Sequence, residues 1–220
     1  MIGLAGCGAI AGLGAGAALT VVQAIPGLAA VAGDTYDRTG SHMVEAEYTG
    51  LQGRDYAVLV STDRIIEANH PRIVRVMTNA LTRRLSEEEV GATAMVPGPR
   101  VLEYQYSTPN WPAMSFSDLA EEFTVDRLIL VEILEYRHNE PGNQHLWDGR
   151  FSARVGVVEA DGSIPDDFAF LREIRVSYPD TTHTRRELSE EHIEAVLQTR
   201  MADRISWLFY DHEELNSMPY

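Results

Sequence analysis

Charge is divided unevenly along this chain, and the division constrains how it can fold. Residues 1–33 contain no charged side chain, whereas the rest of the 220 residues carries the whole formal net charge of −15. A remainder of this length is sufficient to bury one sizeable hydrophobic core. We therefore predict an apolar anchor or tether over residues 1–33, a linker or entry strand over 34–53, and a single domain over 54–220.

The sole cysteine of the chain lies near the start of the uncharged stretch. Leu4, Ala5 and Gly6 precede Cys7, and this order resembles the lipobox of bacterial lipoproteins, whose cysteine receives a diacylglyceryl group. The resemblance implies lipidation of Cys7. Only six residues, none of them basic, precede Cys7, whereas a signal peptide has a basic start and a longer apolar segment. Either the true start codon lies upstream or the lipobox match is accidental.

The residues that follow Cys7 allow two interpretations. Gly8, Gly12 and Gly16 recur at four-residue spacing, which on a helix gives the small-residue face of packed membrane helices. Pro26-Gly27 would break or kink such a helix, and glycine and alanine contribute little transfer energy to a bilayer. Residues 8–33 are therefore either a membrane-inserted helix or a flexible tether.

Composition excludes several chemistries. All eighteen basic residues are arginine, so the chain cannot form a lysine Schiff base or a P-loop of the usual kind. One cysteine cannot build an internal disulfide or a cysteine-rich metal site. A strongly acidic surface repels phosphate backbones, which disfavours nucleic acid as a partner. We expect no cofactor and no catalytic residues.

Hydrophobic patterns in the domain predict alternating strands and helices. A valine-rich strand over 55–62 precedes a helix that Asn69 would cap and Pro71 would begin, with apolar residues recurring from Ile73 to Leu85. A second strand over 91–96 ends at a proline-rich turn. Two short helices follow, over 101–106 and from Ser115 or Ser117 to Phe123.

The second half of the domain predicts three consecutive strands and a long helix. The strands cover residues 127–136, 150–159 and 168–178, and we expect them to form an antiparallel meander. Ser189 caps the last helix, whose apolar face continues to Phe209. The prediction is an α/β fold, with a mixed five-stranded sheet in the order β-α-β-α-β-β-β-α covered by helices.

Three segments together resemble a group of uncharacterised bacterial envelope lipoproteins. They are Leu-Ala-Gly-Cys-Gly-Ala-Ile at 4–10, Leu-Ile-Leu-Val-Glu-Ile at 128–133 and Arg-Ile-Ser-Trp-Leu-Phe-Tyr at 204–210. The element order is also similar to the amino-terminal domain of TolB and to the lipoprotein that activates penicillin-binding proteins. These resemblances imply a non-catalytic, protein-binding module with no family catalytic residues, although a shared fold alone does not fix function.

An aromatic connection is the preferred candidate for a binding site. It contains Tyr104, Tyr106, Trp111 and Phe116, interrupted by prolines. Exposed aromatic rings in loops act as interface anchors or stack on sugars. The alternative is that these rings cover the edge of the core.

Titratable residues give only weak signals. His138, Glu140 and His145 flank a Pro141-Gly142 turn and offer nitrogen and oxygen ligands to a metal, but a solvated hairpin explains them equally well. A second group near the start of the last helix fits a capping or surface role: His183, His192, Asp180 and Glu190. The sequence contains no Gly-x-Ser-x-Gly motif to support a hydrolase.

The expected function is an interaction or assembly module of the bacterial cell envelope. The expected location is a membrane, reached through the lipidated N-terminus on its periplasmic face, with an envelope protein as partner. One alternative is a glycan or small-ligand binder, for which a deep apolar pocket beside Trp111 is the distinguishing feature. An envelope hydrolase is the other alternative, and a cleft with clustered, perturbed carboxylates and histidines would favour it.

Overall fold

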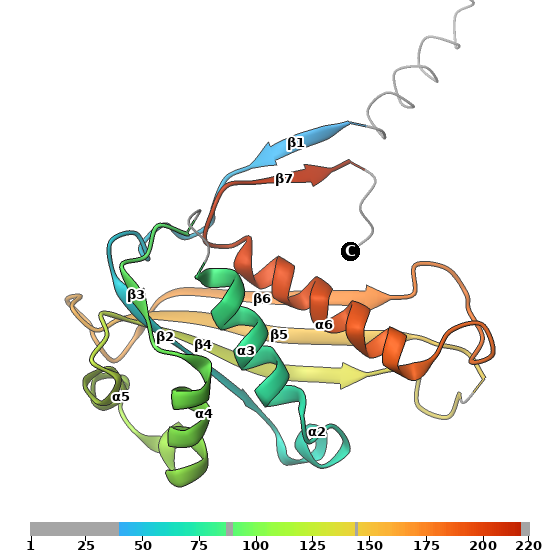
Figure 1. The fold of residues 1–220 in the computed structure, drawn as a ribbon, viewed down its shortest axis with the longest axis horizontal. Coiled ribbons are helices and arrows are strands. Elements are labelled where there is room, and N and C mark those ends of the chain that lie inside the picture. The colour runs from blue at the N-terminus through green and yellow to red at the C-terminus, as the bar shows by residue number, and fades with distance from the viewer. Residues whose placement is uncertain (1–39, 87–89, 144, 217–220) are drawn as a thin grey trace, which may run out of the picture. The chain divides into compact units, whose positions relative to one another are not determined.

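The computed structural model describes residues 40–86, 90–143 and 145–216. Its main sheet has the strand order β3-β2-β4-β5-β6 (Figure 1). Strand β2 is parallel to β3 and β4, whereas β4, β5 and β6 are antiparallel. The mixed five-stranded sheet and the meander are therefore confirmed. The strands are β2 (Asp55–Thr62), β3 (Ala94–Met95), β4 (Arg127–Arg137), β5 (Gly149–Glu159) and β6 (Phe168–Tyr178).

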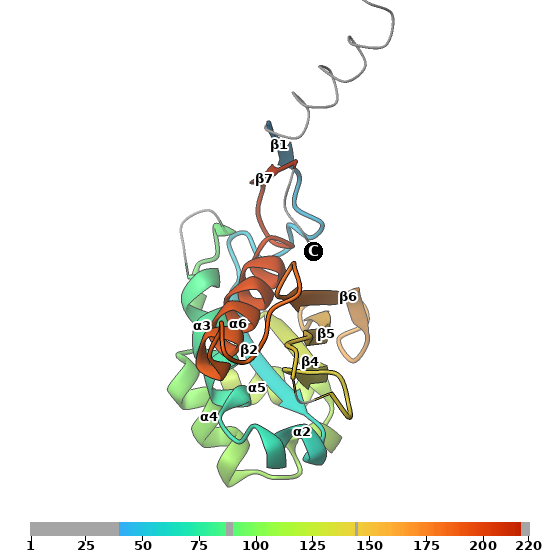
Figure 2. The same ribbon diagram turned by 90° about the vertical axis from the view of Figure 1, so that its right-hand side faces the viewer.

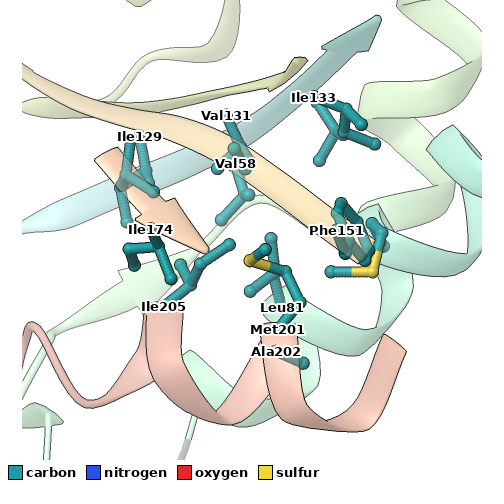
Figure 3. Packing of buried hydrophobic residues seen from close by; sticks show 14 of the residues in the cluster. Val58, Leu81, Ile129, Val131, Ile133, Phe151, Ile174, Met201, Ala202 and Ile205 are labelled. Carbon is teal, nitrogen blue, oxygen red and sulfur yellow. The ribbon is translucent and has the colours of Figure 1, made fainter. Parts of the chain in front are cut away.

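Two long helices cover one face of the sheet. Helices α3 (Ile73–Leu85) and α6 (Glu190–Ser206) lie side by side there, as Figures 1 and 2 show. Alternate residues of each strand point toward them, because successive side chains of a strand face opposite ways. Figure 3 shows this core, in which Val58 and Phe151 pack with Leu81 and Met201.

Shorter helices cover part of the opposite face. Helices α4 (Gly98–Ser107) and α5 (Phe116–Phe123) and the short 3-10 helix η2 (Trp111–Ala113) contribute to a second apolar cluster with Ala57, Leu59 and Leu128. Strand β2 is thus buried on both faces, which explains its continuous apolar sequence.

The prediction that Asn69 caps a helix is wrong. Asp63 instead caps a short helix, α2 (Arg64–Asn69), accepting hydrogen bonds from the backbone of Ile65 and Ile66, both at 2.8 Å. Asn69 is the last residue of that helix, and α3 begins after Arg72. Asp63 takes the capping role because it follows β2 directly and meets the free N–H groups of the first turn.

Residues before β2 pack with the domain, although the sequence predicted a linker or entry strand over 34–53. Leu51 is 1% exposed within the main core, and the Tyr48 N–H donates to the Leu208 carbonyl over 2.9 Å. Strand β1 (Ser41–Val44) pairs with β7 (His212–Leu215) in a two-stranded antiparallel sheet that the sequence did not predict. The last helix ends at Ser206, yet Leu208 and Phe209 remain buried.

The predicted anchor, including Cys7 and residues 8–33, lies outside the described residues. Within the described ranges, none of the helices combines the length and the apolar character needed to cross a bilayer.

Candidate functional site

A groove lies where the connections from two parallel strands diverge. The chain leaves β2 toward α3 on one face of the sheet, and leaves β3 toward α4 on the other. Such a divergence at the carboxyl ends of neighbouring strands produces the crevice where α/β proteins bind ligands. Here the groove has a volume of about 890 Å³ and is lined by the last residues of β2, by α2, α3 and α4, and by Trp111.

Two predicted aromatic residues line this groove. Tyr106 lies in the last turn of α4 with 91% of its surface exposed, and Trp111 begins η2 half-buried. Helix α4 ends at Ser107, and the Trp111 N–H donates to the Thr108 carbonyl over 2.9 Å. The prolines on both sides of Asn110-Trp111 prevent a regular helix from continuing, which explains the tight turn that carries the indole.

The other two aromatic residues pack into the second cluster instead. The Tyr104 ring lies 5.0 Å from that of Phe123, and its hydroxyl donates to the Met114 sulfur over 3.3 Å. Burial, followed by the nearby Glu122 carboxylate, raises the pKa of Tyr104. Phe116 packs against Phe168, with 5.2 Å between ring centres. The structure thus brings together two of the four predicted residues at the groove.

Polar groups of both signs line the groove, and the sequence did not single them out. Arg64 and Glu67 come from α2, Arg75 from α3 and Glu103 from α4. Gln105 donates from Nε2 to the Val60 carbonyl over 3.0 Å, while its buried Oε1 accepts no hydrogen bond within the described part of the chain. Helix α2 was not predicted, so no signal pointed to Arg64 and Glu67.

The histidines and acids of the hairpin are not brought together. His138, at the end of β4, is buried, and its Nδ1 lies 2.9 Å from Glu190 Oε1 on α6. Among the described residues, the group with metal-ligand spacing that contains His138 includes neither Glu140 nor His145.

The second group of titratable residues makes local contacts. His192 Nε2 lies 3.0 Å from the Tyr178 hydroxyl, and His183 Nε2 lies 3.1 Å from Thr181 Oγ1. Asp180 is paired with Arg200 through two hydrogen bonds of 2.7 Å. These hydrogen bonds lower the pKa of Asp180, and neither histidine lines the groove.

No protein-family profile and no curated protein sequence matches the chain. Solved structures do resemble it. Lipoprotein GNA1162 from Neisseria meningitidis is 12% identical, with a TM-score of 0.45 over 69% of this chain and 97% of that one. The minor lipoprotein from Acinetobacter baumannii is 10% identical, with a TM-score of 0.33 over 68% and 88%.

A third similar structure is the PelC dodecamer from Paraburkholderia phytofirmans, 10% identical with a TM-score of 0.39 over 78% of this chain and 97% of that one. The similar structures thus include bacterial lipoproteins, which are the class of protein that carries a lipobox. TM-scores below 0.5 do not show that function is shared. Similarity to TolB and to the penicillin-binding-protein activator stays a prediction.

Proposed function

We propose that this chain is a non-catalytic interaction module of the bacterial cell envelope. In this proposal a lipid on Cys7 holds the N-terminus at the periplasmic face of a membrane, and the acidic domain binds an envelope protein through the groove at the end of β2. The observation that carries the proposal is the position of Tyr106 and Trp111 along that groove.

The exposure of Tyr106 is the first step of the argument. A tyrosine that is 91% exposed leaves its ring in water, and packing against a partner would remove that apolar surface from water. Aromatic side chains at the centre of protein interfaces contribute most of the binding free energy. Trp111, half-buried on the second cluster, provides a rigid wall against which a partner side chain can pack.

The character of the groove favours a protein partner over a small ligand. Small-ligand sites are mainly apolar and enclose most of the ligand. This groove is instead bordered by exposed charged and proline side chains, among them Arg64, Glu67 and Glu103. It is therefore an open, amphipathic surface. A protein segment with both apolar and charged side chains matches it.

A glycan binder is the second candidate, and it rests on the hollow beside Trp111. Indole and phenol rings stack on sugar faces, and the neighbouring arginine and glutamate side chains can hydrogen-bond hydroxyl groups. The groove is open and bordered by exposed charged side chains, whereas a deep, enclosed pocket would distinguish this function, so the glycan binder ranks second.

The anchor is tested through Cys7. The full chain expressed in a bacterial host should incorporate an alkyne-tagged fatty acid, and mass spectrometry should find a diacylglyceryl cysteine at the mature N-terminus. Cys7→Ala should abolish both signals. A wild-type product that keeps its first methionine and an unmodified thiol would overturn the proposed anchoring.

The groove is tested by photo-crosslinking in the same cells. A photoreactive amino acid at position 106 should yield a discrete adduct with an envelope protein, and Trp111→Ala should reduce it at least tenfold. The matched control places the photoreactive group at Leu171, which is 55% exposed on β6. Equal adduct yields from both positions would refute the groove as the partner site. A glycan adduct that glycosidases remove would instead support the second candidate.

A further inference from the structure

Three elements bring two histidines and a glutamate together away from the groove. His70 closes α2, His138 follows β4, and Glu194 lies in the second turn of α6. The two imidazole rings are 4.9 Å apart between centres. Glu194 Oε1 lies 3.8 Å from His138 Nε2 and 4.0 Å from His70 Nδ1. The candidate ligand atoms of all three residues lie within 4.8 Å of one another.

The hydrogen bonds of His138 are unusual for a buried histidine. Its side chain is 4% exposed, and its Nδ1 lies 2.9 Å from Glu190 Oε1, so the carboxylate holds the proton on Nδ1. In the described part of the chain, Nε2 is buried without any hydrogen-bond partner. An orphaned buried nitrogen is costly unless something else binds it. A histidine that binds a metal typically has one ring nitrogen hydrogen-bonded to a carboxylate and the other nitrogen free to bind the ion.

A cavity adjoins the same cluster. It has a volume of about 510 Å³ and is lined by His70, Glu194 and Tyr136, together with Gln198 and the arginines Arg72 and Arg75. The Tyr136 ring packs edge-on against both histidines, and its hydroxyl accepts a hydrogen bond of 3.0 Å from Gln198 Nε2. This packing fixes the orientation of the two imidazole rings. The cavity leaves room beside His70 and Glu194 for a further ligand such as water.

We propose that His70, His138 and Glu194 form a divalent transition-metal site of the zinc type, with Glu190 orienting His138 and one coordination position open to the cavity. Two imidazoles and one carboxylate are a common ligand set for zinc, and three protein ligands with an open fourth position are typical of accessible sites. The inference is independent of the groove and of the proposed partner.

The distances between the candidate ligand atoms fit a site whose side chains move closer together when the ion binds. Ligand atoms around tetrahedral zinc lie about 3.4 Å apart, because each bond is about 2.1 Å long. Two of the pairs are already at 3.8 and 4.0 Å. Small side-chain rotations of Glu194 and His70, which are both partly exposed, bring all three atoms into range. His138 can stay where Glu190 holds it.

Zinc binding is measured on the full chain in detergent, with Cys7→Ala in every variant so that the thiol contributes no ligand. We expect one Zn²⁺ per chain after dialysis and metal analysis, and competition with a chromophoric chelator gives the affinity. Zn²⁺ should also raise Tm, because a preformed site binds it more tightly in the folded chain than in the unfolded chain. A chain that retains no zinc would overturn the proposal and leave the cluster as an ion-paired histidine.

Variants separate this site from adventitious binding by other histidines. Glu190→Gln should weaken zinc binding about 10- to 100-fold, as loss of an orienting partner does. Glu194→Gln and His70→Ala remove ligands and should weaken it further. Glu121→Gln makes the same charge change on the exposed surface of α5, away from the cavity, and should leave the affinity within about threefold of wild type. Equal affinity in the Glu194 and His70 variants would refute the site, with circular dichroism confirming that each variant is folded.

Discussion

The Tyr48 hydroxyl donates a hydrogen bond to Glu159 Oε1 over 2.8 Å, which ties the segment before β2 to the end of β5. The Arg127 guanidinium strengthens the same junction, because it donates to the Gly50 carbonyl over 3.1 Å and pairs with Asp161. Burial and the Glu159 carboxylate raise the pKa of Tyr48, so its hydroxyl keeps the proton at all ordinary pH values. The segment before β2 is therefore part of the folded domain.

Tyr48→Phe removes this hydrogen bond while leaving the ring in place. We expect the free energy of unfolding to fall by about 1.5 kcal/mol, the low end for a hydrogen bond to a charged acceptor, because the Glu159 side chain is 33% exposed. Tyr106→Phe is the control, because its hydroxyl lies on a 91% exposed side chain. Denaturant unfolding of both variants measures the difference. Equal stability of the two would show that the hydrogen bond to Glu159 does not stabilise the junction.

Gly149 at the start of β5 should tolerate no side chain. A Cβ there would lie 2.6 Å from the Tyr178 carbonyl oxygen and 2.8 Å from Leu197 Cδ1, so the backbone of β6 and the Leu197 side chain would have to move. We expect Gly149→Ala to lower stability by about 1–3 kcal/mol, the cost of overpacking, despite the gain from restricting the unfolded chain.

Gly156 on the same strand provides the comparison for that variant. The atoms nearest to a Cβ at this position belong to the Phe168 ring, at 2.3 Å, and this side chain is 39% exposed and can move more easily than backbone. Gly156→Ala should therefore cost less than Gly149→Ala. The reverse order in thermal unfolding would contradict the packing described for the start of β5.

The main sheet could be predicted from the sequence because its pattern is local. Strand β4 is nearly continuous in apolar residues and lies centrally, while β5 and β6 alternate as half-buried strands do. Ser189 was predicted as a cap and Ser115 as one of two candidates, and both accept hydrogen bonds from the first turns of their helices. Short-range chemistry thus determines these elements.

Long-range pairings could not be predicted. Strands β1 and β7 are polar, and their residues face each other across more than 160 positions, so neither shows a pattern of its own. His70 lies between the predicted cap, Asn69, and Pro71, and the sequence did not single out Glu194. Their meeting with His138 depends on how α6 crosses the sheet, which no local spacing specifies.

The ion pair between Asp180 and Arg200 predicts a pH dependence. Arg200 lowers the pKa of Asp180 below its unfolded value near 3.8, so the pair adds stability above that value and loses it as the pH falls through the folded pKa. The carboxylate is 33% exposed, and solvent screening limits the contribution to about 1 kcal/mol or less.

Asp180→Asn should therefore be less stable than wild type at pH 7, and the difference should be smaller at about pH 2, because Asp180 loses its charge as the pH falls through its folded pKa. Arg200 keeps its hydrogen bond to the Ser177 carbonyl in this variant, so the comparison isolates the charge. Glu140→Gln, on the exposed hairpin, makes the same charge change and should show no such difference. Urea unfolding at the two pH values measures both. A stability gap that persists unchanged at low pH would show that the pair acts through packing.

Substitutions of Tyr106 and Trp111 should distinguish an effect on partner binding from an effect on stability. Tyr106 is almost wholly exposed, so Tyr106→Ala should change the free energy of unfolding by less than about 0.5 kcal/mol. Trp111 packs on the second cluster, and Trp111→Ala should cost at least about 1 kcal/mol. If the groove is the partner site, both variants lose the partner, although only one loses stability. Retention of the partner by Tyr106→Ala, measured in the crosslinking assay with the photoreactive group moved to position 103, would place the interface elsewhere on the domain.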